Sequence, residues 1–537
     1  MKRLFTVIMA VIMLLSLCGC MAAGTAGNSS AAASGNAAHG GGNIYVEEGG
    51  SFVMYDGEVF NGKTSIGEFS VGFGKGNITP SNPAGHTILG GGNKISTGID
   101  SQLYAICIAM TDSDGNTAIV MSVDTTNISN SAITAMERWV DTMYDIPQEN
   151  ITISSIHQHS TPAWSTEYQN EALTAMQQAV RTAMNDRAPA EMYINTVQTE
   201  NLAFVRHYLY TKKYLGGLIK DEFVVTDNYN QDKATGGTYT KHMTAADNDM
   251  QLVKFVRDGK DDIILVNFQG HPIDGYECKP LDGSDGYNLH ADWPGVMRSE
   301  VEEELGANVM YISGAGGNLS SRTRIAGERT YNGQEYGGND WITHGKKAAG
   351  YVVAAEGSYR KVNTGKIESK FITQSYAVDH SEDSKAAAAK EIHEAMNQSE
   401  AEAVEVMKKY PNQFSSVHHA RSVYQKSQMG DTIDISVGVI SVGDVAFSCH
   451  QYEMFDTNGV ELKKGTVGNK NYAVADQLAN PYAMTVIATM AKGTKEYIPS
   501  AYADSYGCYE ADISKFATGS GEQLVTSYLE ILNELHG

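Results

Sequence analysis

Cysteine is scarce in this chain of 537 residues, which contains six. Two of them, Cys18 and Cys20, lie in the N-terminal apolar stretch. The other four are isolated and have no C-x-x-C spacing: Cys107, Cys278, Cys449 and Cys508. Four scattered cysteines in a chain of this length do not make a disulfide scaffold, so no pairing is predicted. The body is long enough to bury a large core instead.

Basic residues are also few compared with acidic residues. The chain has 40 Lys and Arg against 63 Asp and Glu, which gives a formal net charge of −23. An acidic excess of this size argues against nucleic acid as a partner, because the phosphate backbone attracts basic surfaces. It is instead typical of a soluble exported protein.

Apolar runs long enough to span a bilayer are absent from the body. The N-terminal run follows Lys2 and Arg3, which is the pattern of a secretory signal peptide. Its end, Leu17-Cys18-Gly19-Cys20, resembles a bacterial lipobox. That resemblance implies cleavage before Cys20 and lipid attachment to its thiol, and a plain signal peptide or a short anchor is the alternative. We therefore expect an exported protein, lipid-anchored at the bacterial cell surface or in the periplasm.

Residues 21–42 contain mostly Ala, Gly and Ser and almost no large apolar side chain. Such a composition is typical of a flexible tether. The predicted organisation is thus a lipoprotein signal peptide at residues 1–19, a tether at residues 20–42 and one hydrolase domain at residues 43–537.

Within the body, apolar runs at 103–110, 118–123 and 151–156 read as strands, and residues 131–143 have the apolar spacing of a helix. Alternation of this kind predicts an α/β fold, a mixed β-sheet flanked by helices with the active site at the carboxyl ends of strands. Further helices are expected at three places, residues 170–185, 341–355 and 523–535. A long amphipathic helix is expected at 384–409, and the polar, Gly-rich residues 210–245 are interpreted as an insertion or long loop.

The stretch Y-I-S-G-A-G-G-N-L-S-S-R, residues 311–322, combines a strand end with glycine. Its apolar start breaks into Gly314, Gly316 and Gly317, which allow a tight turn and close approach of the backbone to a ligand. Ligands in helix-covered sheets bind beyond the carboxyl ends of strands. Four other strands also end in polar sequence, so this stretch is a candidate wall of a binding site.

Histidines follow two of those strands. The strand at 151–156 leads into His157-Gln158-His159, and the strand at 263–268 leads into Gly270-His271-Pro272. Neutral imidazole is a preferred zinc ligand, and a catalytic zinc keeps one position open for water. Taken alone, His157 and His159 are equally well explained as polar residues at a strand end. His271 adds a third imidazole at the same edge.

Six short motifs resemble, in order over residues 68–515, those of the neutral/alkaline non-lysosomal ceramidases. H-Q-H-S-T-P at 157–162 is similar to their H-T-H-S-G-P stretch, and A-G-G-N-L-S-S at 315–321 to their G-[DN]-[LV]-S-P-N stretch. The other four are F-V-R-H-Y at 204–208, N-F-Q-G-H-P at 267–272, D-V-A-F-S-C-H-Q-Y-E at 444–453 and E-Y-I-P-S-A-Y-A-D-S-Y-G-C-Y-E at 496–510. The C-terminal β-sandwich of longer family members has no counterpart in the matched region.

The resemblance implies a zinc enzyme and a set of site residues. The implied zinc ligands are His157, His271, Glu453 and Tyr497. The implied catalytic residues around the scissile carbonyl are His159, Arg206, Ser320 and Tyr509, with Gly90 as a backbone contact to substrate. Zinc lowers the pKa of bound water and polarises a carbonyl, which suits amide hydrolysis.

The same residue types suggest roles. Arg206, Tyr509 and His159 are donors suited to the oxyanion of a tetrahedral intermediate, and His159 suits proton transfer to the leaving amine. Ser320 has no His or Asp tied to it in sequence as a triad partner. We therefore favour metal-activated water as nucleophile and Ser320 as a positioning group, with acylation of Ser320 as the alternative.

Three departures from the family pattern lie next to the substrate region. Ser320-Ser321-Arg322 replaces S-P-N, Thr161-Pro162-Ala163 replaces G-P-G, and His450-Gln451-Tyr452 replaces the sequence before the family's glutamate turn. These changes leave the acyl-chain and head-group preference open.

The expected function is hydrolysis of the N-acyl amide bond of ceramide or a related N-acyl lipid to a fatty acid and a sphingoid or other amine. The expected partners are that substrate and the membrane that holds the lipid anchor, and the oligomeric state is left open. One alternative is a zinc hydrolase of the same fold that acts on another ester or amide. A second is a non-catalytic surface lipoprotein that binds a ligand in the same pocket.

Overall fold

The computed structural model describes residues 44–46, 52–54, 67–89, 94–214, 217–226, 237–276, 278–335, 340–465, 478–493 and 495–537. All of these residues lie in one compact unit, Gly41–Gly537. The predicted signal peptide, tether and lipidation site at Cys20 lie outside the described residues, and so does Gly90.

A nine-stranded mixed sheet forms the larger part of this unit. Its strand order is β18-β16-β15-β10-β3-β6-β7-β8, with β22 paired to β10. The strands are β3 (Ser70–Asn77), β6 (Tyr104–Thr111), β7 (Thr117–Val123), β8 (Ile151–Ser155), β10 (Ala188–Gln198), β15 (Asp249–Arg257), β16 (Ile263–Phe268), β18 (Asn308–Ser313) and β22 (Arg360–Val362). The pairs β7·β8 and β16·β18 are parallel and the others antiparallel. The predicted mixed α/β sheet is thus confirmed.

A second sheet packs against one face of the first. It has the order β23-β24-β25-β27 and consists of β23 (Ile367–Ala377), β24 (Thr432–Val442), β25 (Val445–Cys449) and β27 (Met484–Ala488). One buried cluster joins the two sheets and contains Ile106 and Phe255 from the larger one with Phe447 and Val486 from the smaller one. The fold therefore has two sheets with a core between them, whereas the sequence predicted a single sheet.

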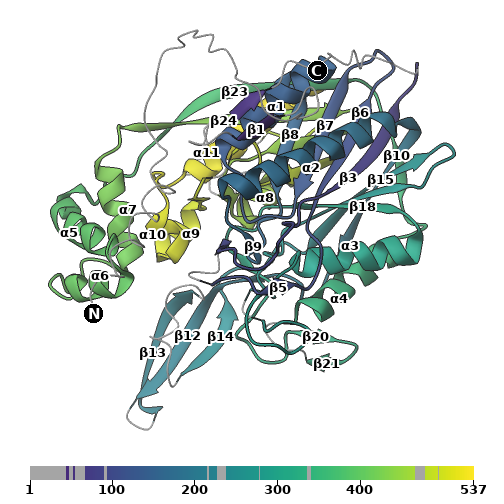
Figure 1. Ribbon diagram of the computed structural model, residues 1–537. Helices are drawn as coiled ribbons and strands as arrows, with labels where there is room; N and C mark the ends of the chain where they lie inside the picture. The colour runs from purple at the N-terminus through teal and green to yellow at the C-terminus, as the bar shows by residue number, and fades with distance from the viewer. Residues whose placement is uncertain are drawn as a thin grey trace, which may run out of the picture. The chain divides into compact units, whose positions relative to one another are not determined.

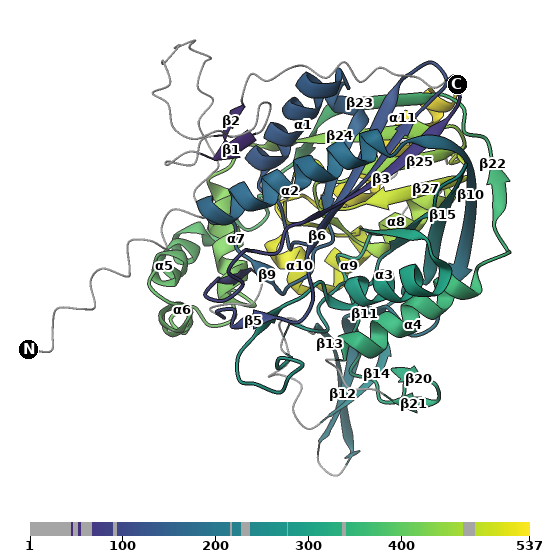
Figure 2. The same ribbon diagram turned by 45° about the vertical axis from the view of Figure 1, so that its right-hand side comes forward.

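Helices cover the outer faces. The larger sheet carries α1 (Asn130–Tyr144), α2 (Thr166–Asn185), α3 (Asp292–Leu305) and α4 (Trp341–Ala354). The smaller sheet carries α8 (Asp456–Lys464) and α11 (Ser520–His536). In Figures 1 and 2, α2 crosses the face of the sheet that contains β3 and β6. The layers follow the order helices, large sheet, small sheet, helices.

Alternate glycines let α2 lie directly on β3. A Cβ atom at Gly72, Gly74 or Gly76 would stand 1.9–2.0 Å from a backbone oxygen of α2, and these oxygens belong to Ala183, Ala179 and Ala175. Every second residue of this part of β3 therefore meets every fourth residue of α2. No side chain fits between the two backbones, so the glycines are a steric requirement.

Strands of two or three residues pair segments outside the two large sheets. The pairs are β1 (Ile44–Val46) with β2 (Phe52–Met54), β4 (Ile88–Leu89) with β9 (Thr161–Pro162), β5 (Gly98–Ile99) with β17 (Asn288–Leu289), β11 (Phe204–Val205) with β19 (Leu319–Ser320), β20 (Thr330–Tyr331) with β21 (Gln334–Glu335) and β26 (Glu453–Met454) with β28 (Tyr497–Ile498). After β28 the chain forms α9 (Ala501–Tyr506) and α10 (Tyr509–Ile513). Four of these segments carry residues predicted for the site.

Two predictions about local structure are wrong. The region 210–245 contains a three-stranded sheet of β12 (His207–Tyr214), β13 (Ile219–Thr226) and β14 (Thr238–His242). Its outer strands are polar because most of their side chains face solvent, which removes the apolar alternation on which a strand prediction relies. The expected long helix at 384–409 is two helices, α5 (Ala386–Met396) and α6 (Glu400–Met407), because the Ser399 side chain caps a new helix by accepting from the Glu402 N–H.

A third helix, α7 (Val417–Ser427), packs with α5 and α6 around a small core of their own. The four cysteines in the described body are thiols rather than disulfides. Over the described ranges, the helices lack the length and apolar composition that crossing a bilayer requires.

The contact between β3 and α2 makes a stability prediction. Gly74→Ala should lower the free energy of unfolding by about 3 kcal/mol, because the added methyl group overpacks a backbone contact. Gly350→Ala is the matched control, since Gly350 lies in α4 and a methyl group added there would have nothing within 4 Å. That change should raise stability by about 0.5–1 kcal/mol. Denaturant unfolding of both variants measures the difference, and equal effects would refute the steric argument.

Candidate metal centre

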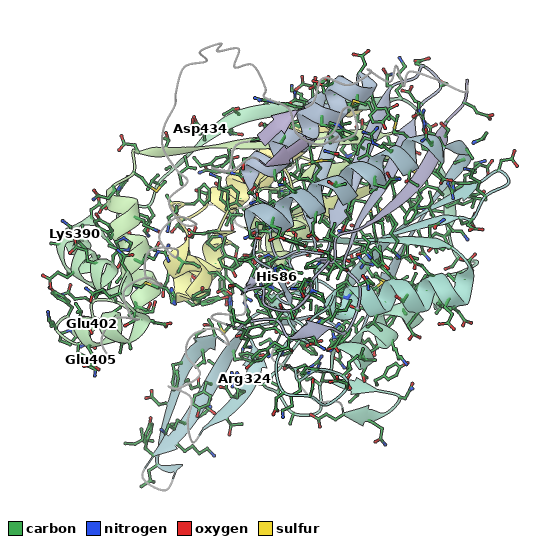
Figure 3. All side chains as sticks on the ribbon, viewed as in Figure 1. His86, Arg324, Lys390, Glu402, Glu405 and Asp434 are labelled. Atoms are coloured by element: carbon green, nitrogen blue, oxygen red, sulfur yellow. The ribbon has the colours of Figure 1, made fainter. Side chains whose placement is uncertain are left out.

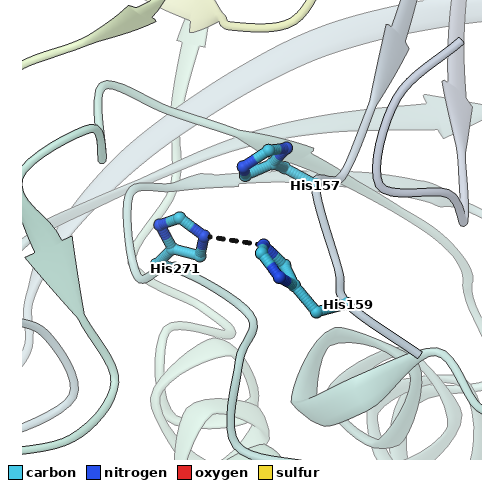
Figure 4. Close-up of side chains that lie close together, drawn as sticks. All are labelled: His157, His159 and His271. Carbon is cyan, nitrogen blue, oxygen red and sulfur yellow. Dashed lines mark hydrogen bonds between the residues drawn. The ribbon is translucent and has the colours of Figure 1, made fainter. Parts of the chain in front are cut away.

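Three imidazoles meet beyond the ends of two strands of the large sheet. His157 and His159 follow β8, and His271 follows β16. Their ring centroids are separated by 4.9, 5.1 and 5.3 Å (Figure 4). Nε2 of His271 lies 3.2 Å from Nε2 of His159, and one ligand nitrogen from each residue lies within 4.8 Å of the others. The structure therefore brings the three predicted histidines to one point.

His157 is held in an unusual backbone conformation. Its φ of 62° is left-handed, a region that costs a residue with a Cβ atom on the order of 1–3 kcal/mol. The backbone N–H donates to the Thr125 carbonyl at 3.0 Å, and ring Nδ1 donates to the Thr126 carbonyl at 2.8 Å. These contacts leave Nε2 directed at Oε2 of Glu453, 3.2 Å away. A strained, oriented histidine beside a carboxylate is typical of a functional site.

The glycine-rich loop after β18 makes this convergence possible. A Cβ atom at Gly316 would lie 2.3 Å from the carbonyl oxygen of Gln269, two residues before His271. A Cβ atom at Gly317 would lie 2.6 Å from the carbonyl oxygen of Glu453. The loop thus packs backbone to backbone against both segments that carry predicted ligands, and glycine is required by the close approach. Together these segments line a small cavity with His157.

Burial and nearby charges shift the pKa values of two site histidines in opposite directions, down for His271 and up for His157. Burial lowers the pKa of His271 well below its usual value, and the nearby charges of His157 and Arg206 lower it further. Burial also lowers the pKa of His157, but the Glu453 carboxylate outweighs it and the net pKa is raised. His271 is therefore a neutral imidazole, the form that binds metal ions.

The donor set fits a zinc ion. Two ligands of a tetrahedral zinc lie about 3.3 Å apart, given metal–ligand bonds near 2.0–2.1 Å. The His157–Glu453 separation is 3.2 Å, and ligand nitrogens of His157 and His271 lie within 4.8 Å of each other. The second nitrogen of His157 is bonded to a backbone carbonyl, and His271 also hydrogen bonds to the backbone of Gly316. Such contacts orient histidine ligands in metal sites.

Tyr497 reaches this site through strand pairing. Glu453 and Tyr497 are partners in the parallel pair β26·β28. Nη2 of Arg206 donates to the Tyr497 hydroxyl at 3.2 Å and to the Gly317 carbonyl at 2.7 Å. Burial raises the pKa of Tyr497 well above its usual value, with the Glu453 charge adding to the effect. Tyr497 is thus a neutral phenol whose hydroxyl position is fixed by Arg206.

Behind Tyr497 lies a fully buried ion-pair network. Glu510 accepts from Arg206 Nε at 2.6 Å and from His207 Nε2 at 3.0 Å, and His207 Nδ1 hydrogen bonds to the Tyr506 hydroxyl at 2.6 Å. Burial raises the pKa of Glu510, but Arg206 and His207 outweigh it and hold the carboxyl ionised far below its usual range. The network fixes the guanidinium that in turn fixes Tyr497.

His207, Cys508 and Glu510 also lie close enough to form a second candidate metal group. The Arg206 guanidinium already occupies one oxygen of Glu510, and its charge opposes a second cation there. Burial, with the Glu510 charge, raises the pKa of the Cys508 thiol well above its usual value. We interpret this cluster as a structural ion-pair network.

The loop that carries His271 is clamped by a second buried carboxylate. Oδ2 of Asp274 is 2.6 Å from Arg329 Nη2 and 3.0 Å from His344 Nδ1. The Asp292 side chain accepts from the Gly275 N–H at 2.8 Å. The loop is therefore tied to α3 through Asp292 and to α4 through His344.

The remaining predicted residues lie at different distances from the histidines. Tyr509 is half-buried with its ring 6.2 Å from that of Tyr497, and burial raises its pKa to about 12. Ser320 is buried opposite Phe204 in the β11·β19 pair. Among described residues, the hydrogen bond to its Oγ comes from the Arg322 N–H at 3.0 Å, so no histidine is bonded to it.

Little in the sequence points to three residues that support the site. Glu510 and His207 stand directly beside the predicted Tyr509 and Arg206, but nothing in those motifs indicates that they pair with each other across 303 positions. Asp274 lies three residues after His271 in a polar loop. A buried carboxylate is recognised from its neighbours in space. The sequence does not show which residues these neighbours are.

The fold and the site together define an α/β protein with a metal-competent histidine centre at the carboxyl ends of strands. Searches with the sequence find no matching family model and no matching curated protein. Among solved structures, the chain is similar to one described as "Ceramidase complexed with C2", with a TM-score of 0.61 and 12% identity over 87% of this chain and 75% of that one.

The neutral ceramidase from Pseudomonas aeruginosa is similar as well, with a TM-score of 0.60 and 11% identity over 87% of this chain and 74% of that one. The chain therefore has the fold of the neutral ceramidases. The resemblance carried by its short motifs is confirmed at the level of the fold.

The buried network predicts that Glu510 is a stability determinant. Glu510→Gln should lower the free energy of unfolding by about 3–5 kcal/mol, because the buried Arg206 guanidinium loses its counter-charge and His207 loses a carboxylate partner. Glu534→Gln is the matched control, since the ion pair of Glu534 with Lys370 is at the surface and contributes little. Chemical denaturation at neutral pH provides the measurement. A Glu510→Gln protein as stable as the control would contradict the network's structural role.

Proposed function

We propose that this protein is a zinc-dependent amidohydrolase that cleaves the N-acyl bond of ceramide or a related N-acyl lipid. The products would be a fatty acid and an amine. One observation carries the proposal above the others. His157, His271 and Glu453 line one cavity, with His159 next to His271, in a fold shared with ceramidases. Export and lipid attachment at Cys20 are part of the same proposal and rest on the N-terminal sequence.

His157, His271, Glu453 and Tyr497 would hold the metal. Zinc, when bound, lowers the pKa of water toward neutrality and polarises a carbonyl oxygen. The residues that would hold the metal are already oriented by the protein. His271 is neutral, Nε2 of His157 faces Glu453, and Arg206 fixes the Tyr497 hydroxyl.

His159 is the group we assign to proton transfer. It is partly exposed, and its Nε2 lies 3.2 Å from Nε2 of His271. An imidazole there is suited to hold a proton near the leaving amine and release it as the amide breaks. Tyr509 is a protonated phenol near neutral pH and suits donation of a hydrogen bond to an oxyanion.

Arg206 acts through its neighbours. Its Nε and Nη2 are engaged by Glu510, Gly317 and Tyr497. We therefore assign it a positioning role and place oxyanion stabilisation on Tyr509.

A hydrolase of the same fold acting on another ester or amide is the second candidate function. Arg322, which stands where the family pattern has Asn, donates through Nη2 to the Ile273 and Asp274 carbonyls beside the His271 loop. The resemblance places this changed residue next to the substrate region, so the second candidate function stays open. Parallel assays of ceramide, other N-acyl amides and esters separate the two functions.

His271→Ala tests the metal centre. We expect the wild type to bind about one zinc ion per chain and the variant to lose at least about 100-fold in zinc affinity, since even outer contacts of a ligand contribute 10- to 100-fold. Hydrolysis of N-acyl amides should fall with it. His536→Ala, at the exposed C-terminal end of α11, should leave zinc content and activity unchanged. An enzyme that remains fully active after its metal is removed would exclude the proposal.

Ser320→Ala separates two mechanisms. If Ser320 only positions groups, the variant loses one hydrogen bond near the reacting carbonyl, and the rate should fall by about 10²- to 10³-fold with turnover still measurable. We expect this result and no covalent adduct, because the Ser320 Oγ bonds to Arg322 N–H rather than to a histidine. Intact mass measured during turnover gives the check. An acyl group on Ser320 would establish it as the nucleophile instead.

A further inference from the structure

The strands β12 and β13 form a ribbon that extends away from the sheets and helices (Figures 1 and 2). β14 pairs with β12 only from Tyr208 to Thr211. Beyond Thr211 the described ribbon has two strands, in which Lys213 faces Lys220 and Tyr214 faces Ile219. We call residues 212–214 and 218–220 the hairpin tip.

The hairpin tip exposes apolar side chains. Leu218 is 88% exposed, Ile219 52% and Tyr214 41%. The other large apolar side chains that the described surface exposes lie in other parts of the chain: Ile95, Val256, Leu281, Val404 and Tyr502. Single exposed residues are ordinary on a soluble protein, whereas a cluster at the end of a projecting ribbon marks an interaction site or an aggregation hazard.

Lysines surround this cluster. Lys212 and Lys213 precede Tyr214, and Lys220 follows Ile219. Asp221 faces Lys212 across the ribbon and Glu222 pairs with Lys220, so the three lysines exceed these two acidic residues by one charge. The tip is still locally positive on a chain with a net charge of −23. Like charges at facing strand positions, as at Lys213 and Lys220, oppose strand pairing, so this arrangement suits an anionic surface.

We propose that the hairpin tip docks the protein onto an anionic phospholipid surface. Tyr214, Leu218 and Ile219 enter the boundary between head groups and acyl chains, and the lysines contact lipid phosphates, which is the division of labour in interfacial membrane segments. A protein partner is less well suited, because three apolar side chains on a narrow ribbon fall far below the roughly 800 Å² per partner of a stable protein interface.

The ribbon connects directly to the candidate site. β12 begins at His207, which bonds Glu510 and is the neighbour of Arg206 in the chain. Seven strand steps from His207 to Tyr214 span about 23 Å at 3.3 Å per residue. Docking would therefore hold the site within about this distance of the lipid surface. This step rests on the proposed function, because it gives the docked site a lipid-borne N-acyl substrate.

A tryptophan placed at the tip reports docking directly. Leu218→Trp in the full chain should lose fluorescence in the presence of vesicles of brominated phosphatidylglycerol, and much less with brominated phosphatidylcholine or high salt. Val404→Trp is the matched control, because Val404 is exposed on α6 between Glu402 and Glu405, which Figure 3 labels. Any lipid anchor at the N-terminus is common to both proteins. Equal quenching in the two variants would overturn the proposal.

An activity assay then connects docking to catalysis. Leu218→Asp combined with Ile219→Asp should weaken binding to phosphatidylglycerol vesicles at least about tenfold, since it removes two apolar side chains and adds two negative charges. Hydrolysis of a long-chain N-acyl substrate held in those vesicles should fall by a similar factor. Hydrolysis of a soluble short-chain N-acyl amide should not change, because both side chains are exposed and far from the site.

The two proposals fail in different ways. A wild type that cleaves no N-acyl substrate removes the proposed function, while the quenching experiment still decides docking. A wild type that cleaves both substrates, with a double variant unimpaired on vesicles, removes docking and leaves the proposed function standing.

Discussion

The close approach of backbones around Gly316 and Gly317 is the constraint on which the site depends. Three segments meet there: the loop after β18, the turn that leads to His271 and the β26 strand that carries Glu453. A side chain at either glycine would push a ligand-bearing segment away by more than the tolerance of metal coordination, which is a few tenths of an ångström. The alternate glycines of β3 apply the same principle on a larger scale, since they set how closely α2 lies on the sheet.

Buried ion pairs then hold in place the segments that the close backbone contacts bring together. Buried charges are placed in pairs, Arg206 with Glu510, Arg329 with Asp274 and Arg298 with Asp124, and His207 and His344 add further contacts to the first two carboxylates. Such pairs are costly to desolvate, and removing one partner is more costly still, so each network holds its members in a single arrangement. Two of the networks lie directly behind Tyr497 and the His271 loop. The site is therefore rigid where metal ligands are expected.

Two groups of elements at the surface are less closely packed against the two sheets than the rest of the fold. The ribbon of β12 and β13 and the group of α5, α6 and α7 pack mainly within themselves. Their outer faces carry charged side chains, and the ribbon adds an exposed apolar tip. Elements of this kind are free to acquire a separate role, because they contribute little to the core between the two sheets.

The sequence by itself determined the apolar strands and helices of the scaffold, the glycine-rich loop and the positions of the strand-end histidines. These features depend on local periodicity and local backbone freedom, which neighbouring residues specify. It misjudged the ribbon at 210–245, because strands with two solvated faces lack an apolar pattern, and it joined α5 and α6, because a capping serine resembles an ordinary polar position. Only the tertiary structure decided that the strands form two sheets and that Glu510 pairs with Arg206 and His207. It also decided that Ser320 faces Arg322 rather than a histidine. Contacts between residues hundreds of positions apart depend on how sheets stack and how loops close, and no local pattern records that geometry.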